Sequence, residues 1–327
     1  MLKRFTRAAS SLMLALTSAL AFANSGTSDP FPEKPVRLVV TFGGGAAELA
    51  RLVAQKMTDE LGQQVVVDVQ PAAAGVVATS QVARSAPDGY TVLVGSNNSM
   101  IFRPLTMKQI PYDPLKDFAP LSMFSVPALA LAVNSKLGIN SIQELAQYMQ
   151  KHPGQAFVGV WGVPSIGSLS ALQLREAVPG LNFQPVPYRD EGAAVIDTIG
   201  GQVPAVIVTP SSLLGPAQQG TLKVLAVLAD ERRPRYENVP TIGELLPGFK
   251  PLRPFTGFWV PVGTPDNRVE ILNKAIMSAL NDKDIQQQVN NLGSFLKAST
   301  PQQLEQALRA ETELMSAALK RAGVEPE

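Results

Sequence analysis

The sequence contains no cysteine and a single histidine, His152. Without cysteine the chain can form no disulfide and cannot be a lipid-anchored lipoprotein, so its stability must come from a hydrophobic core. One histidine and no thiol leave no credible metal site built on soft ligands. A hard-cation site made only of carboxylates stays open, but Asp and Glu are scattered without the spacing of a metal loop. We therefore expect neither a metal nor a cofactor.

Long hydrophobic runs are also missing beyond the N-terminus. The first residues include the basic side chains Lys3, Arg4 and Arg7, and a mostly apolar stretch follows over residues 12–22. Ala21 and Ala23 place small residues where a signal peptidase reads. The apolar stretch is far shorter than the roughly 20 residues of a membrane-spanning helix. We predict a signal peptide over residues 1–23, cleaved after Ala23, and an exported, soluble chain in the periplasm.

An excess of charge of either sign is absent. Cleavage after residue 23 leaves 304 of the 327 residues and removes three basic residues, so 25 basic and 27 acidic residues remain, a net charge of −2. Neither the basic nor the acidic residues form a long run in the sequence. This balance makes nucleic acid and anionic membrane surfaces improbable partners and argues against membrane insertion. At about 100 to 200 residues per domain, the length favours two domains.

Short β-rich runs alternate with amphipathic stretches from Val36 to Leu228, which is typical of an α/β fold with mainly parallel sheets. The polar stretch 230–240 breaks the pattern and is a candidate crossover. Three helical stretches at the C-terminal end have no strand between them, so we expect them to pack back on the first domain. The predicted strands are 36–40, 64–69, 90–94, 128–133, 157–160, 204–208, 223–228 and 257–260.

Several helices have recognisable first turns. Ser141 with Glu144 three residues later forms the pattern of a capping box, in which two side chains satisfy free amides reciprocally. Thr264-Pro265-Asp266 begins another helix, and Thr300-Pro301 with Gln303 begins the terminal one.

The stretch "TFGGGAAELAR" (41–51) joins the first strand to the first helix. It is neither a P-loop, which needs Lys-Ser/Thr after its last glycine, nor a dinucleotide fingerprint. A glycine-rich turn at a helix N-terminus nevertheless offers backbone N–H groups to an anion of any kind. We expect Phe42, Gly43, Gly44 and Gly45 to contact a ligand, with a tight structural turn as the alternative. Glu48 would repel an anion if it faced the same space.

Polar clusters follow other strands, where an open α/β sheet presents its ligand crevice. For any one cluster the alternative is an ordinary helix cap. Trp161 beside Gly162 at a strand end is expected to line a pocket, with a place in the core as the alternative. The clusters are "SNNS" (96–99), "WGVPS" (161–165), "PYRDEG" (187–192) and "TPSS" (209–212), the last led by Thr209.

An enzyme is a weaker alternative. "GVPSIG" (162–167) approaches the Gly-x-Ser-x-Gly pattern of a serine esterase, but Val163 replaces the first glycine that the strained turn requires. His152 ends a polar helix, where an exposed position is favoured over a role as the base for Ser165. We expect no enzymatic activity.

Taken together, six stretches resemble one family, the extracytoplasmic receptors of tripartite tricarboxylate transporters, often called Bug proteins. The likeness covers nearly the whole chain after residue 23, and the ordered occurrence of "APDGYT", "PYDPLKDFAP" and "GGQV" is highly specific. The stretches are "FPEKPVRLVVTF" (31–42), "VARSAPDGYTVLVGSNNS" (82–99), "IPYDPLKDFAPLS" (110–122), "VPYRDEGAAVIDTIGGQV" (186–203), "LKVLAVLADERRPRYENVPTIGE" (222–244) and "FWVPVGTP" (258–265).

The resemblance implies a two-domain periplasmic binding protein, with domain 1 over 24–127 plus 229–327 and domain 2 over 128–228, joined by crossing strands around a ligand cleft. It implies a monomer that closes on a small organic acid and delivers it to the membrane subunits of a transporter. The resemblance also implies that backbone N–H groups, hydroxyls and ordered water, and not arginine, bind the carboxylate. The positions that match are Phe42 to Gly45, Ser96, Asn97, Gly162, Ser165, Tyr188 and Arg189.

This chain departs from the family pattern at several loops. Gly43-Gly44-Gly45 replaces a longer Pro- and Gly-containing loop, and only Ala47 or Glu48 lies near the usual aspartate. Trp161 and Pro164 stand where small or polar residues are usual, and Trp161 favours an acid with an aromatic or apolar body over citrate. The altered loops also motivate an alternative, a ligand sensor of the same fold that acts in signalling.

Overall fold

The computed structural model describes residues 30–43, 45–162, 165–291 and 294–326. The chain divides into a short N-terminal unit, Met1–Glu33, and a main unit, Lys34–Glu327. Only residues 30–33 of the first unit are described. The predicted signal peptide and the predicted ligand contact at Gly44 lie outside the described residues, as do Val163 and Pro164.

The described strands form two five-stranded sheets. The first has the order β2-β1-β3-β10-β4, with β1, β2 and β3 parallel and β10 antiparallel to both neighbours. Its strands are β1 (Val36–Val40), β2 (Val65–Val69), β3 (Thr91–Ser96), β4 (Phe118–Ser125) and β10 (Thr256–Pro261).

The second sheet repeats this design with the order β7-β6-β8-β5-β9, in which only β5 runs against its neighbours. The fold is therefore an α/β fold with two domains and mainly parallel sheets, which confirms the predicted class. Its strands are β5 (Leu129–Asn134), β6 (Phe157–Trp161), β7 (Gln184–Tyr188), β8 (Ala205–Val208) and β9 (Leu222–Leu228).

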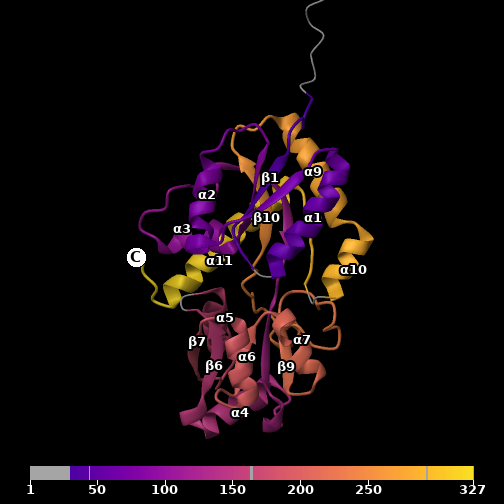
Figure 1. Ribbon diagram of the computed structural model, residues 1–327. Helices are drawn as coiled ribbons and strands as arrows, with labels where there is room; N and C mark the ends of the chain where they lie inside the picture. Colours follow the sequence, from indigo (N-terminus) through magenta and orange to yellow (C-terminus); the bar gives the residue numbers. More distant parts are fainter. Residues whose placement is uncertain (1–29, 44, 163–164, 292–293, 327) are drawn as a thin grey trace, which may run out of the picture. The chain divides into compact units, whose positions relative to one another are not determined.

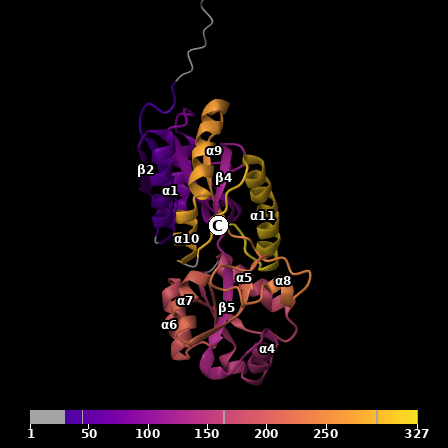
Figure 2. The same ribbon diagram turned by 90° about the vertical axis from the view of Figure 1, so that its right-hand side faces the viewer.

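Helices cover both faces of the first sheet. Figure 2 shows α1 and α9 on one side of the sheet and α11 on the other. Val39, Leu93 and Trp259 pack against α2 and α11, which confirms that the C-terminal helices return to this sheet. These helices are α1 (Gly45–Leu61), α2 (Val76–Ala83), α3 (Arg103–Thr106), α9 (Asp266–Leu280), α10 (Lys283–Asn291) and α11 (Pro301–Arg321).

The second sheet is also buried on both faces, because alternate residues of a strand point to opposite sides. In β5, Leu129, Leu131 and Val133 join one core cluster, whereas Ala130 and Ala132 join the other. Figure 1 and Figure 2 together show the surrounding helices. They are α4 (Ile142–Lys151), α5 (Ile166–Ala177), α6 (Glu191–Gly200), α7 (Pro210–Gln218) and α8 (Ile242–Leu245).

Of two capping boxes predicted from the sequence, one is confirmed and one is incomplete. Thr300 and Gln303 form a full capping box at α11. Ser141 caps α4 as predicted, but the capping box is wrong, because the Glu144 carboxylate accepts the Asn140 N–H at 2.7 Å instead of the Ser141 N–H.

One strand, β4, was not predicted, and β7 was expected only as a short strand without bounds. Pro120 lies inside β4 and pairs with Trp259, and the stretch around it is rich in proline. Proline cannot donate to a sheet ladder and is tolerated on edge strands, and β4 lies at the edge of its sheet.

Candidate ligand-binding site

The first candidate surface lies where β1 and β3 end, and we call residues 41–43 with 96–99 the first rim. The two strands are parallel neighbours, and the Thr41 amide and hydroxyl both donate to the Val94 carbonyl at 3.1 Å. The Ser99 hydroxyl lies 3.4 Å from that of Thr41. The structure thus brings the predicted Phe42 and Gly43 into the same rim as Ser96 and Asn97.

Gly43 lies open in this rim. It is exposed, and no heavy atom lies within 4 Å of the position that a Cβ would occupy. Gly45 begins α1, so the turn ends at the positive end of a helix dipole. Glu48 is exposed and pairs with Arg51 at 2.8 Å, which partly neutralises it.

Asn97 is held rigidly. Its Oδ1 accepts the Phe255 N–H at 2.5 Å, and its own N–H donates to the Phe255 carbonyl at 3.2 Å. The side chain is buried, and its Nδ2 has no hydrogen-bond partner among the described residues. A buried donor without a hydrogen-bond partner carries a free-energy cost.

The turn Ala72–Gly75 (η1) packs against the first rim. Gly75 has φ 83°, and a Cβ there would lie 2.5 Å from the Thr41 Cβ and 3.3 Å from the Ser99 Cβ. Only glycine allows this backbone conformation together with so close an approach.

The second candidate surface lies where β6, β7 and β8 end, and we call residues 161–162, 165, 188–191 and 209–212 the second rim. Trp161 pairs with Tyr188, and the Gly162 N–H donates to the Tyr188 carbonyl at 2.9 Å. The half-buried indole of Trp161 packs over Gly167, where a Cβ would come within 2.8 Å of the ring.

Ser165 is the N-cap of α5 in a full capping box with Ser168. Its hydroxyl donates toward the Trp161 carbonyl at 2.7 Å and accepts the Ser168 N–H at 3.1 Å. His152 lies exposed at the end of α4, as predicted, and its Nδ1 lies 2.9 Å from the Tyr148 carbonyl oxygen. The Ser165 hydroxyl therefore caps α5, and no hydrogen bond between Ser165 and His152 occurs among the described residues.

Tyr188 and Arg189 differ in orientation. The Tyr188 ring lies over Gly159, and burial together with a hydrogen bond to Asp197 raises the pKa of its hydroxyl to about 12. The part of Tyr188 that lies in the second rim is its carbonyl, which accepts the Gly162 N–H. Arg189 is 87% exposed and pairs with Asp190 at 3.0 Å.

Glu191 was not singled out from the sequence, yet it organises the end of β8. Its carboxylate accepts the Thr209 hydroxyl at 2.6 Å and the Thr209 N–H at 3.3 Å, and it also accepts the Ser212 hydroxyl. These donors belong to the N-cap and first turn of α7, where the helix dipole favours a negative charge, and the Glu191 carboxylate supplies one. Asp190 caps α6 by accepting the Ala193 N–H at 2.8 Å, so two carboxylates belong to the second rim.

The described residues contain neither a candidate metal site nor a candidate membrane span. No group of three or more His, Cys, Asp or Glu side chains could hold a metal ion there. In the same part of the chain, no helix has the length and apolar content needed to cross a bilayer.

Two mixed sheets flanked by helices, with glycine and hydroxyl residues at the carboxyl ends of their parallel strands, define a two-domain α/β binding protein of the periplasmic type. A family model described as "Tripartite tricarboxylate transporter family receptor" matches residues 49–324. The chain therefore belongs to this family of solute-binding receptors.

Known proteins of this kind are similar to the chain over about nine-tenths of its length. Protein BugT of Bordetella pertussis is 31% identical over 303 residues, covering 91% of this chain and 92% of BugT. A Rhodopseudomonas palustris protein solved with adipate is 28% identical with a TM-score of 0.77, covering 91% of this chain and all of that one. The periplasmic binding protein BugD is 29% identical with a TM-score of 0.73, with 91% and 100% covered.

Proposed function

We propose that this protein is a periplasmic receptor that captures a small organic acid by closing its two domains and delivers it to the membrane subunits of a tripartite tricarboxylate-type transporter. The observation that carries the proposal is the open glycine turn of the first rim. It sits at the end of a parallel strand and the start of α1, in a chain of the receptor family. No reaction is needed for this function.

The carboxylate is held at the first rim. Backbone N–H groups around Gly43 and the free Nδ2 of Asn97 are the donors, and the N-terminus of α1 adds a favourable dipole. Ordered water and the Ser96 hydroxyl complete the shell. Donors in a partly dry cleft act more strongly than in water, so closure strengthens binding.

The second rim holds the body of the ligand. Trp161 offers an apolar surface, whereas Asp190 and Glu191 disfavour a second negative charge. Arg189 does not offset them, because it is already paired with Asp190. We infer a preference for monocarboxylates with an apolar or hydroxyl-bearing body over dicarboxylates and citrate. This preference separates the chain from its adipate-bound relative.

The proposal also covers export and the domain organisation of the mature protein. Residues 1–23 direct the chain to the periplasm, and cleavage follows Ala23. The mature protein acts as a monomer with domain 1 built on the first sheet and domain 2 on the second. The stretch 229–327 expected in domain 1 is divided, because Tyr236 and Ile242 pack in the cores of the second sheet. BugD is likewise described as periplasmic.

A thermal-shift panel of mono-, di- and tricarboxylates, amino acids and aromatic acids tests the function. A true ligand at about one hundred times its Kd stabilises by about 2.7 kcal/mol, which appears as a shift of a few degrees. If no acid shifts the melting temperature, the receptor function is wrong. If only dicarboxylates do, the function stands and the inferred preference is wrong.

A further inference from the structure

A separate pocket lies along the segments that connect the two sheets. Its volume is about 240 Å³, and it is lined by the end of β4, the residues after β9, the residues before β10, Lys297 and α11. None of the residues of either rim lines it. The volume is slightly below the roughly 300 to 1,000 Å³ of drug-sized ligand sites, so one small molecule fits.

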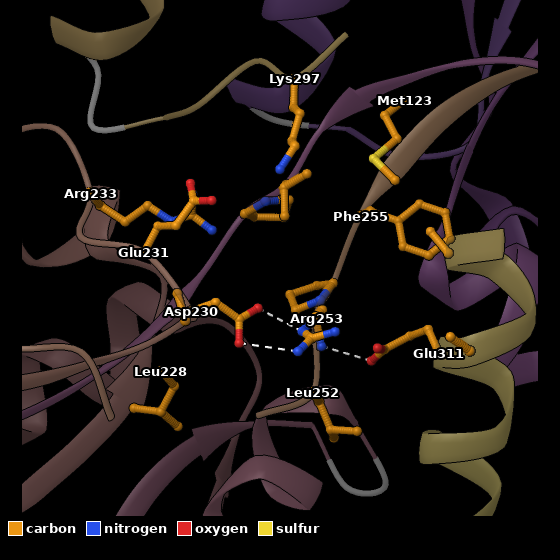
Figure 3. Close-up of a pocket in the computed structure, with 16 residues that line it drawn as sticks. Met123, Leu228, Asp230, Glu231, Arg233, Leu252, Arg253, Phe255, Lys297 and Glu311 are labelled. Atoms are coloured by element: carbon orange, nitrogen blue, oxygen red, sulfur yellow. Dashed lines mark hydrogen bonds and ion pairs between the residues drawn. The ribbon is translucent and has the colours of Figure 1, made fainter. Parts of the chain in front are cut away.

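The pocket contains two cations whose charge is not matched. Arg233 is 9% exposed, and its buried Nε has no hydrogen-bond partner among the described residues. Its guanidinium lies 4.9 Å from the ring centroid of Phe295, and no ion pair to it or to Lys297 occurs in the part of the chain described. Figure 3 shows Arg233 and Lys297 extending into the same space from different elements. An arginine stays charged in proteins, so its burial without a partner carries a cost.

Asp230, Glu231 and Glu311 are the carboxylates of the pocket, and none forms an ion pair with Arg233 or Lys297 among the described residues, although the charges of Glu231 and Asp230 act on Arg233. Asp230 pairs with Arg253 through contacts of 2.6 and 3.1 Å, and Glu311 accepts the Arg253 N–H at 2.7 Å (Figure 3). Glu231 is exposed, and its charge acts on Arg233 at longer range.

The remaining wall is apolar. Leu252 and Phe255 are 1% and 3% exposed, and Met123, Val126 and Leu228 complete the surface. A ligand that matches this wall has a compact apolar body and a single anionic group.

We propose that this pocket is a second site, which binds a small organic acid with its carboxylate between Arg233 and Lys297 and its apolar body against Met123, Leu252 and Phe255. Arg233 supplies planar donors and Lys297 a point charge, a combination suited to a carboxylate. The site shares no residue with either rim, and its direct link to the first rim among the described residues is the pair of hydrogen bonds between Phe255 and Asn97 described above.

Calorimetric titration of the full chain with benzoate tests the site, with the [¹³C-methyl]-methionine signal of Met123 as a local reporter. Arg233→Met and Lys297→Met should each lower benzoate affinity about tenfold, since each removes a charge-assisted contact. Glu231→Gln should raise it. Arg84→Met and Lys320→Met, which remove exposed positive charges elsewhere, should leave it unchanged.

The reporter separates this site from the rims and from misfolding. In the wild type, the Met123 methyl signal should shift in proportion to benzoate occupancy, whereas a folded Lys297→Met protein should show a weakened response. Benzoate that binds without moving the Met123 signal, affinity unchanged in both charge variants, or no binding up to about 10 mM would overturn the proposal.

Discussion

The carboxylate of Glu191 takes the hydroxyl of Thr209 at 2.6 Å and its N–H at 3.3 Å, and so fills the anion site at the start of α7 with a group of the protein itself. Glu191→Gln keeps a side chain that can accept these hydrogen bonds but removes the charge. Dicarboxylate affinity should rise about fivefold, which corresponds to about 1 kcal/mol, while monocarboxylate affinity changes little.

Calorimetry with adipate and hexanoate, which have the same chain length, measures this difference. Glu313→Gln removes an exposed charge on α11 and serves as the control. Equal changes for both acids would show that Glu191 does not set the preference.

Gly75 supports the first rim through its close approach to Thr41. Gly75→Ala should destabilise the protein by about 3 kcal/mol and weaken acid binding, because the new methyl group must displace Thr41 as well as strain the backbone. Gly62 is a matched control, since it has φ 65° but nothing within 4 Å of its Cβ position.

For Gly62→Ala only the backbone cost of about 1 kcal/mol is expected, with unchanged affinity. Denaturant unfolding and calorimetry measure both quantities. Two variants with the same loss of stability and no loss of binding would contradict the role of Gly75.

Trp161 packs over Gly167 and forms part of the second rim. Trp161→Ala should cost about 2 kcal/mol of unfolding free energy and shift the preference away from acids with apolar bodies. Trp161→Phe keeps an aromatic ring and should retain most of both properties. A thermal-shift panel on the two variants checks this, and unchanged affinity and preference in Trp161→Ala would remove Trp161 from the site.

Glu311 makes stability depend on pH. Burial raises the pKa of its carboxyl from 4.5 to about 7, so the folded protein holds this proton more tightly than the unfolded chain. The resulting stabilisation is fully present below pH 4.5 and is lost as the pH rises to about 7. Glu311→Gln stays neutral and can still accept the Arg253 N–H.

The variant should therefore exceed the wild type at pH 8 by on the order of 2 kcal/mol, or a few degrees, and match it near pH 5. Melting temperatures at the two pH values measure this, with Glu313→Gln as the control. A difference that does not change with pH would contradict the raised pKa.

The strands that the sequence predicted are continuous apolar runs, several of them rich in valine, whereas the two that it missed or left without bounds carry proline inside the strand. Pro120 lies in β4, and Pro185 and Pro187 lie in β7. Both strands are at the edges of their sheets, where a missing N–H costs no ladder bond. Local patterns cannot show that a strand is an edge, because that depends on the order in which distant segments pair.

The site was predictable only as a set of strand ends. Phe42, Ser96, Trp161 and Thr209 follow strands, and parallel strands bring their ends together. The contact between Glu191 and Thr209 could not be predicted, because it joins side chains from two strand ends whose spacing the sequence does not give. The pocket at Arg233 was missed for a related reason, since its walls come from five separate parts of the chain.

The central claim is that the glycine turn of the first rim donates backbone hydrogens to a carboxylate. Selective ¹⁵N-glycine labelling allows the Gly43 amide to be followed during titration with the acid that stabilises the protein most. We expect a saturable downfield shift at Gly43 and none at Gly62. A Gly43 amide that stays unmoved at saturation would contradict the claim.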